Sequence, residues 1–403
     1  MHNLLQLNEM GKYNFDKIVD RRGTDSIMTD CLTKVFGRDD LCPLWIADMN
    51  FEVCPAISKA LEKRGSHHIY GYSSAPESYW NSIIDWAKHR HNWTIDREEL
   101  TYVNGVVRGY AYALNFFTQK GDTIVIQQPV YHPFRNVAIG NHRHVVSNDL
   151  IKKGDSYEMD LEGLERIFIT ENPKLMVLCN PHNPIGICWD KETLVKVADL
   201  ADKYNVIVVS DEIHGDLAIF GHKHTPFATV SENAAKVSVS FAAPSKTFNI
   251  PGLSSSWCVV KNPELRKPFF DWLQVNEFSV PTWVATVATE AAYTQGEEWL
   301  DELIPYIEDN IKAVEKYCEE NLPGVHAVRP QASFLVWLDC TGLGLKHDEL
   351  IDLFVNHAHL ALNDGEMFGK GGEGHMRLNV ANSRKMLLDS LAQLKDAINS
   401  IKG

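Results

Sequence analysis

Three polar residues, a lysine, an aspartate and an asparagine, each follow an apolar run of this chain. Lys246 lies in the small-residue segment Ala-Pro-Ser-Lys-Thr-Phe-Asn-Ile-Pro-Gly, directly after the run 237–241. Asp211 follows the run 206–210, and Asn183 follows the run 175–179 within Asn-Pro-His-Asn-Pro. A lysine amine can form a Schiff base with a carbonyl, and a carboxylate can keep a heterocyclic nitrogen protonated. The pair predicts a site for a coenzyme that has both groups.

Pyridoxal 5′-phosphate (PLP) is the coenzyme whose chemistry needs such a pair. A lysine in this role must also move a proton, so its pKa has to fall toward neutrality through burial or a nearby cation. Most lysines are simply surface residues. The Pro-Ser-Lys-Thr turn after an apolar strand, together with Asp211, favours the functional interpretation of Lys246.

Asp211, Asn183 and Tyr131 could each have a purely structural role instead of a role in binding PLP. Asp211 could cap a helix, Asn183 could form a turn, and Tyr131 could pack in a loop. In a PLP site, Asp211 would face the ring nitrogen and Asn183 would hydrogen-bond the phenolic oxygen. Tyr131, in Gln-Pro-Val-Tyr-His-Pro, would stack on the ring.

A phosphate site is predicted where a glycine precedes an expected helix. Gly105, Val106 and Val107 would present backbone N–H groups at the helix N-terminus, which favours anions. Ser245 could add a hydroxyl, or it could only pack.

Arg377 lies in an apolar, strand-like run near the end of the chain. Its planar guanidinium suits a substrate carboxylate, with a structural salt bridge as the equal alternative. His214 is either a supporting group near the coenzyme or a core histidine. The histidines show no His-Glu-x-x-His spacing, so no metal site is predicted.

The elements that must position these residues form an α/β fold. Continuous apolar runs separated by helical patterns predict a mostly parallel sheet buried on both faces, with strands at 123–127, 175–179, 206–210, 237–241 and 256–260. Ligands bind beyond the carboxyl ends of such strands. We predict a large domain over 56–295. A smaller α+β domain would combine 296–403 with an irregular N-terminal segment, 1–55.

Composition excludes several classes of protein. The chain has 403 residues and a net charge of −14, which argues against nucleic-acid binding. No apolar run approaches membrane-spanning length, and the N-terminus lacks a signal-peptide pattern. The eight cysteines form no regular framework, which favours a reducing, cytoplasmic location.

The motifs resemble those of the fold-type I PLP-dependent enzymes, the aspartate aminotransferase superfamily. More narrowly, the chain is similar to the MalY/PatB group of cystathionine β-lyases (C–S lyases). The similarity runs from about residue 13 to near the C-terminus, in the stretches Trp-Ile-Ala-Asp-Met (45–49), Tyr-Gly-Tyr (70–72), Gly-Val-Val (105–107), Pro-Val-Tyr-His-Pro-Phe (129–134), 180–186, 210–214, Ser-Lys-Thr-Phe-Asn (245–249) and Met-Arg-Leu-Asn (376–379).

The resemblance implies a role for each residue. Lys246 would be the Schiff-base lysine, Asp211 the pyridinium partner, Asn183 the O3′ donor and Tyr131 the stacking ring. Arg377 would bind the carboxylate of an amino-acid substrate.

Tyr72 would reach the phosphate bound by the neighbouring subunit, so the expected working unit is a homodimer. Two positions depart from the aminotransferase pattern: Ser254 stands where many members have a phosphate-binding arginine, and Ala243 replaces a serine. Asn50 stands where the lyase group often has aspartate.

The sequence therefore predicts a PLP-dependent β-lyase that cleaves L-cystathionine or related cysteine S-conjugates to a thiol, pyruvate and ammonia. The alternative is an aminotransferase of the class I/II family, which shares the early steps. A third hypothesis, a binding or regulatory protein that only keeps the fold, is disfavoured by the intact Lys246–Asp211 pair.

Overall fold

The computed structural model describes residues 11–402 and contains the predicted mostly parallel sheet. Residues 1–10 of the predicted N-terminal segment lie outside the described residues. Strand β10 runs antiparallel to both of its neighbours, and the remaining neighbouring strands pair in parallel. Across the sheet the seven strands are β2 (Leu100–Val103), β10 (Ser256–Val259), β9 (Ser238–Ala242), β8 (Ile207–Asp211), β7 (Leu175–Cys179), β3 (Thr123–Ile126) and β4 (His144–Ser147).

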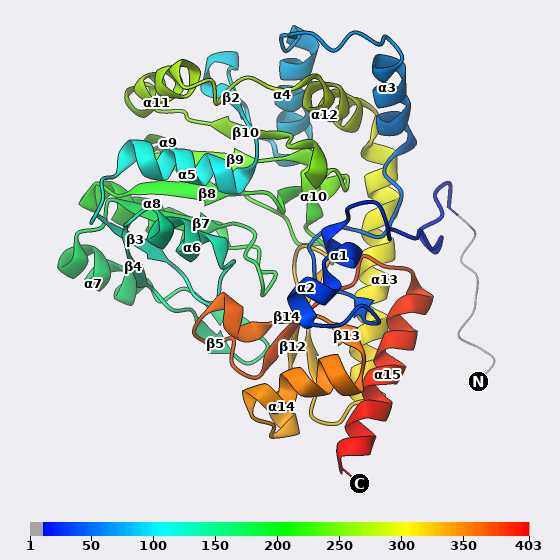
Figure 1. Cartoon of the computed structure of the whole chain (residues 1–403). Helices are drawn as coiled ribbons and strands as arrows, with labels where there is room; N and C mark the ends of the chain where they lie inside the picture. The colour runs from blue at the N-terminus through cyan, green and yellow to red at the C-terminus, as the bar shows by residue number, and fades with distance from the viewer. Residues whose placement is uncertain (1–10, 403) are drawn as a thin grey trace.

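Alternate residues of the central strands enter different cores, which explains why apolar residues dominate these runs and why Ser210, Ser238 and Ser240 within them are also buried. In β7, Leu175 and Val177 pack against one set of helices, while Met176 and Leu178 pack against another. The first set comprises α5 (Val106–Phe117), α6 (Pro133–Gly140) and α11 (Pro263–Val275). The second comprises α7 (Leu161–Glu171), α8 (Lys191–Tyr204) and α9 (Glu232–Val237). Figure 1 shows these helices around the sheet.

The register brings the predicted functional residues to one edge of the sheet. Cys179 pairs with Asp211, and Asp211 pairs with Phe241, so the carboxyl ends of β7, β8 and β9 are level. The segments that follow β7 and β9 carry Asn183 and Lys246. One difference from the prediction is that β8 includes Asp211 instead of stopping before it.

A second group of elements forms a smaller antiparallel sheet, ordered β11 (His326–Val328), β12 (Leu335–Asp339), β15 (His375–Asn379) and β14 (Asn363–Asp364). Two long helices, α13 (Glu297–Asn321) and α15 (Arg384–Lys402), lie side by side next to it (Figure 1). The short helix α14 (His347–Asp352) precedes a π-helical turn, Leu353–His357.

Helices α3 (Pro55–Gly65) and α4 (Glu77–His91) pack against α12 (Trp283–Gln295). A separate hairpin joins β5 (Ile151–Lys153) to β6 (Ser156–Glu158). Within residues 11–402 no helix combines the length and the apolar character needed to cross a bilayer. The domain division at 55/56 and 295/296 stays a prediction.

The N-terminal segment is less irregular than predicted. It contains α1 (Ile27–Asp30), α2 (Leu32–Phe36) and β1 (Cys42–Pro43), and β1 pairs in parallel with β13 (Leu360–Ala361). Buried residues of this segment, including Met28 and Trp45, form a small core with Ala361. The segment is thereby fixed against the smaller sheet. Short helices without a repeating apolar pattern explain why periodicity did not reveal it.

Helix α5 approaches β9 so closely that one position requires glycine. A Cβ added at Gly109 would lie 2.5 Å from Cε1 of Phe241. We expect Gly109→Ala to lower the free energy of unfolding by about 1–3 kcal/mol through overpacking. Urea unfolding would measure the change.

Gly140, the last residue of α6, is the matched control, because an added Cβ there meets nothing within 4 Å. Gly140→Ala should be neutral or stabilising by about 0.5 kcal/mol. Equal effects of the two substitutions would contradict the close approach of α5 to β9.

Candidate active site

Lys246 lies on a one-turn helix, α10 (Pro244–Thr247), directly after β9. The sequence predicted a tight turn here, and the structure makes that turn helical. Its ammonium Nζ donates a hydrogen bond to the carbonyl oxygen of Ala47. The pKa of Lys246 is lowered to about 8, mainly by burial and also by the charge of Arg377, whereas Asp48 and Asp211 oppose the shift. A lysine with this pKa is partly a free amine near neutral pH, which nucleophilic and base chemistry requires.

Asp211 is a buried carboxyl group without a cationic partner. Its side chain is 5% exposed and accepts a hydrogen bond from the backbone N–H of Ile213 (3.0 Å). No ion pair reaches it from any residue in the range 11–402. Burial raises the pKa of Asp211 to about 7, although the Ile213 N–H and Lys246 oppose the shift. The carboxylate lacks a positively charged donor that would hold it ionised.

Arg377, on β15, is the opposite case: a buried guanidinium with no carboxylate partner among the described residues. It is 4% exposed and donates to Oδ1 of Asn183 (3.0 Å) and to the oxygens of Trp45 (3.1 Å) and Asn363. These three bonds use three of its five N–H donors, so two remain available to a ligand. One of these two is on Nε, which has no hydrogen-bond partner among the described residues. The alternative of a structural salt bridge is therefore not what the structure contains.

Asn183 and Tyr131 complete the space around these charges. The backbone N–H of Tyr131 donates to the carbonyl of Asn183 (3.0 Å), so the loops after β3 and β7 are joined. The Asn183 amide oxygen is occupied by Arg377, so its NH₂ group is the part left to bind a ligand. Burial raises the pKa of Tyr131, although the Arg377 charge opposes this. The phenol is neutral at physiological pH.

Gly105, with φ of 144°, precedes α5, and Val106 and Val107 form the first turn of that helix. Their N–H groups lack intrahelical acceptors, as at every helix N-terminus. Ser245 is buried on α10. His214 is also buried, and its Nδ1 has no partner. Burial, with Lys246 and Arg377 adding to it, lowers the pKa of His214 to about 3, so this ring is neutral.

Tyr72, unlike Asp211 and Arg377, lies at the surface of this chain. It is fully exposed, in the segment between α3 and α4, and has no hydrogen bond to any described residue. The prediction that it acts across a subunit interface stays a prediction.

Sequence reasoning assigned no role to four groups that the structure places at the site. The carbonyl oxygens of Trp45 and Ala47 accept from Arg377 and Lys246, and the amide of Asn363 accepts from Arg377. Asp48 contributes a carboxylate that acts on Lys246. The motif Trp-Ile-Ala-Asp-Met was visible in the sequence, but backbone acceptors carry no residue-type signal.

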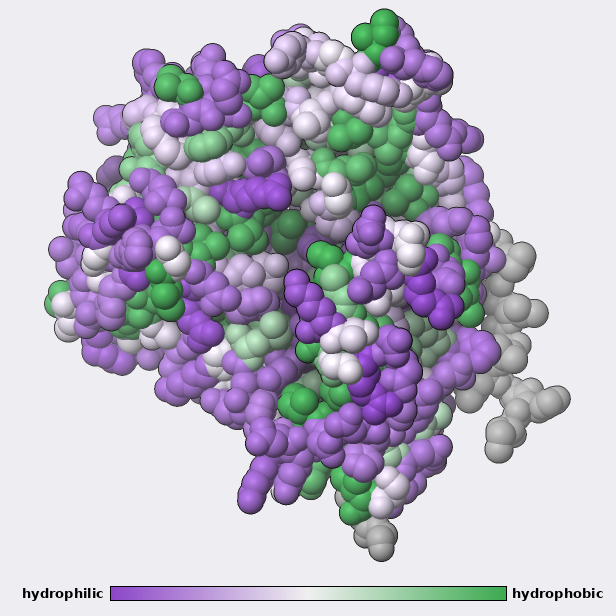
Figure 2. Space-filling view, in the orientation of Figure 1, coloured by the Kyte–Doolittle hydropathy of each residue, from purple (hydrophilic) through white to green (hydrophobic). Residues whose placement is uncertain are grey.

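The uncompensated charges define what the site can bind. Among residues 11–402, none gives Asp211 a cationic N–H donor and none gives Arg377 a carboxylate, and the Lys246 amine completes the set. A protonated pyridine nitrogen satisfies Asp211, and the α-carboxylate of an amino acid satisfies Arg377. The residues present therefore fit PLP. Figure 2 shows the surface of the molecule hollowed at the centre of one face.

Comparison with known proteins gives the class of protein. Residues 40–394 match the family Aminotransferase class I and II. The chain is 42% identical to cystathionine beta-lyase PatB of Bacillus subtilis over 96% of this chain and 100% of that protein. The chain belongs to the class I and II aminotransferase family.

Two solved structures are similar over 96% of the chain. A PLP-bound protein of Clostridium difficile with an aminotransferase name is 41% identical, with a TM-score of 0.93 over its whole length. The PLP-bound C–S lyase of Staphylococcus hominis is 30% identical, with a TM-score of 0.90 over 98% of its length. The fold is therefore that of the fold-type I PLP enzymes, as the sequence predicted.

The raised pKa of Asp211 predicts a pH-dependent gain in stability for Asp211→Asn in the PLP-free protein. A carboxyl whose folded pKa is raised from 3.8 to about 7 loses stability as pH rises through that interval. The neutral amide avoids this loss, so the variant should be more stable than wild type at pH 8 by roughly 2–4 kcal/mol. The difference should shrink toward pH 4.5. Thermal unfolding at both pH values would measure it.

Asp216 provides a control with the opposite sign. Although burial raises its pKa, hydrogen bonds from His91, Thr247 and Trp86 outweigh burial, and the pKa of Asp216 is lowered. Asp216→Asn should destabilise the protein at pH 8. The interpretation of Asp211 is wrong if Asp211→Asn also destabilises at that pH.

Proposed function

We propose that this protein is a PLP-dependent C–S β-lyase acting on L-cystathionine or related cysteine S-conjugates. The overall reaction breaks the Cβ–S bond and the Cα–H bond of the substrate. With one water it yields a thiol, pyruvate and ammonia. With cystathionine the thiol is homocysteine, which would place the reaction in methionine metabolism.

The observation that carries the proposal is the arrangement of Lys246, with its lowered pKa, between an uncompensated buried anion and an uncompensated buried cation. Unpaired buried charges cost several kcal/mol each, so they persist where a ligand supplies their partners. A lysine with only a structural role would need neither the carboxyl of Asp211 nor the guanidinium of Arg377 beside it. The same pairing disfavours a protein that keeps the fold but binds no coenzyme.

PLP, when bound, supplies an electron sink that stabilises negative charge at the substrate Cα. Asp211 would hold the proton on the ring nitrogen, Asn183 would donate its amide to the phenolic oxygen, and Tyr131 would lie against the ring. The N–H groups of 105–107 and the hydroxyl of Ser245 would bind the phosphate, with His214 supporting the site as a neutral ring.

The substrate side depends on two groups. Arg377 would bind the α-carboxylate through the donors that its contacts with Asn183, Trp45 and Asn363 leave. Lys246 would remove the proton from Cα as a free amine. Once Cα is deprotonated, the thiolate at Cβ is the leaving group.

The similarity to PatB and to the S. hominis C–S lyase supports the lyase over other reactions of the family. Aminotransfer is the second candidate, because the C. difficile protein has an aminotransferase name at 41% identity. Both reactions begin with proton removal at Cα, so the product distinguishes them.

We expect the purified enzyme to form pyruvate and free thiol from cystathionine without any keto-acid acceptor. A panel of cystathionine, cystine and S-alkyl cysteines would be assayed for pyruvate, thiol and acceptor-dependent amino transfer. Lys246→Ala should lose both activity and the visible absorbance band of bound PLP. Transfer to a keto acid as the dominant reaction would reject the lyase. A colourless wild-type protein that takes up no PLP would reject the coenzyme.

A homodimer with shared active sites is part of the proposal. Ile69, Tyr70 and Tyr72 are all highly exposed in the segment between α3 and α4. Tyr70 stacks on Trp283 of α12, with ring centroids 6.0 Å apart. Figure 2 shows hydrophobic surface over the part of the molecule where α3 and α12 lie in Figure 1. Exposed apolar surface of this kind favours burial against a second subunit, where Tyr72 would reach the partner's phosphate.

Mixing two inactive variants would test the shared site. In a hybrid of Tyr72→Ala and Lys246→Ala chains, one site keeps both wild-type groups and the other loses both. Subunit exchange in an equal mixture should therefore restore roughly one quarter of wild-type activity. A mixture that shows dimers by light scattering but regains no activity would place Tyr72 outside the partner's site.

We also propose a cytoplasmic location. All eight cysteines lie within the described residues, and each is a free thiol. Free cysteines in this number suit a reducing compartment.

A further inference from the structure

The segment 45–51 lies against both charged residues of the candidate site and contacts them through its backbone. The carbonyl of Trp45 accepts from Nη2 of Arg377 (3.1 Å), and the carbonyl of Ala47 accepts from Nζ of Lys246. One short stretch of chain thus orients the group proposed to bind the carboxylate and the group proposed to react.

Two asparagines hold the 45–51 segment in place. Asn379, two residues after Arg377 on β15, donates to the carbonyls of Ile46 (2.7 Å) and Asp48 (2.6 Å). Asn249, three residues after Lys246, donates to the carbonyls of Met49 and Phe51, and accepts from the N–H of Met49, each at 2.9 Å.

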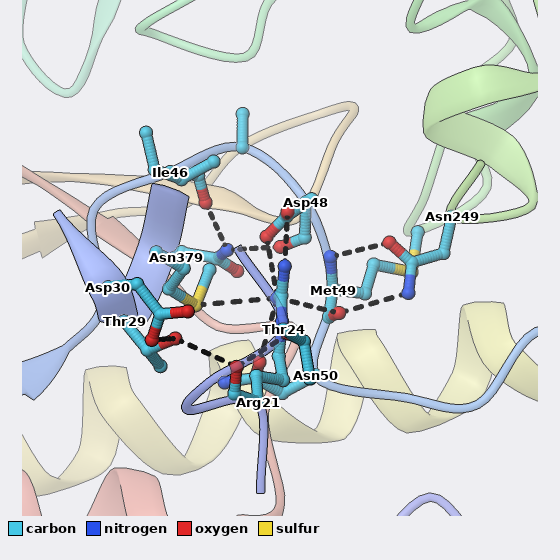
Figure 3. Close-up of polar contacts among 12 residues, drawn as sticks. Arg21, Thr24, Thr29, Asp30, Ile46, Asp48, Met49, Asn50, Asn249 and Asn379 are labelled. Carbon is cyan, nitrogen blue, oxygen red and sulfur yellow. Dashed lines mark hydrogen bonds and ion pairs between the residues drawn. The ribbon is translucent and has the colours of Figure 1, made fainter. Parts of the chain in front are cut away.

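Arg21, from the N-terminal segment, binds the far side of the same stretch. Its guanidinium forks onto Asp48 (2.9 and 2.7 Å) and also donates to Oδ1 of Asn50 (3.0 Å). The Asn50 NH₂ group in turn donates to Asn382. Figure 3 shows the side chains of Arg21, Asn249 and Asn379 converging on the segment. Arg21 and Asp48 are 21% and 15% exposed, so solvent weakens this bidentate pair only in part.

The pair also affects the charge at Lys246. The charged and titratable groups facing Lys246 are Asp48 from the 45–51 segment, Asp211 from β8, His214 from the loop after β8, and Arg377 from β15. Arg21 is the group that neutralises Asp48, and it makes no hydrogen bond to Lys246 or Arg377. Its influence on the site therefore passes through Asp48 and the backbone.

We propose that Arg21 is a positioning residue, which fixes Asp48 and the 45–51 segment so that the carbonyls of Trp45 and Ala47 meet Arg377 and Lys246. This inference rests on the proposed function only in taking Lys246 as the amine that reacts with PLP.

The test uses the full-length chain with PLP removed, and measures the pH dependence of PLP uptake by its visible absorbance. In Arg21→Gln, the Asp48 carboxylate loses its counter-charge and should raise the pKa of Lys246, so the midpoint pH of PLP uptake should move to a higher value. In Asp48→Asn, the carboxylate is absent and the midpoint should move to lower pH. The double variant lacks both charges and should return toward the wild-type midpoint. Opposite shifts cannot come from a general loosening of the fold.

Activity adds a second readout after PLP is restored. Arg21→Gln should lower kcat/KM by roughly 10- to 100-fold, mostly through KM, because Arg377 loses a fixed acceptor. Arg22→Gln is the matched control: Arg22 is the next residue, is exposed and pairs with Asp20. It should leave the midpoint and KM unchanged.

Shifts of the same sign in both single variants, or no shift, would overturn the inference. The inference would also be overturned if neither single variant took up PLP at any pH and the double variant did not restore the uptake. If the opposite shifts are found in a protein that forms no pyruvate, the positioning role stands and the lyase proposal fails.

Discussion

The structure depends on keeping two unlike charges buried and apart. Asp211 ends a strand of the large sheet and Arg377 lies within a strand of the small one, and neither forms an ion pair with any of the described residues. Burial without a partner is unfavourable, so the rest of the fold must supply the stability that these residues remove. The two alternating cores on either side of the seven-stranded sheet are large enough to do so.

Hydrogen bonds to neutral groups reduce the free-energy cost of burying Arg377 and Asp211. Arg377 is surrounded by amide and carbonyl oxygens of Asn183, Asn363 and Trp45 instead of carboxylates. These acceptors fix the direction of the guanidinium without cancelling its charge. Asp211 receives a backbone N–H in the same manner. Such an arrangement orients the charges while leaving them able to attract a ligand, which agrees with electrostatic preorganisation in enzymes.

Much of this was readable from the sequence. The apolar runs predicted β3, β7, β8, β9 and β10 to within one or two residues, because strands buried on both faces are rich in apolar residues. The strand β4, which pairs in parallel with β3, was not predicted. Lys246, Asp211 and Asn183 stood out because polar residues directly after such runs are constrained to one edge of a sheet. The 45–51 segment was not assigned a role, since its contribution is through carbonyl oxygens that every residue has. Arg21 lies in a segment without periodicity, and only tertiary contacts distinguish it from its neighbour Arg22.

Asn249 and Asn379 bind the 45–51 segment from opposite sides. Asn249 lies three residues after Lys246, beyond a strand of the large sheet, and Asn379 lies on the strand of the small sheet that carries Arg377. A separation of the two sheets would have to break these bonds, so Lys246 and Arg377 keep a set spacing. Under the proposed function, these two residues would hold the part that all amino acids share, the Cα and the carboxylate. Substrates of the proposed reaction would then differ only in the group attached at Cβ, and a change of leaving group would not require the reactive centre to rearrange.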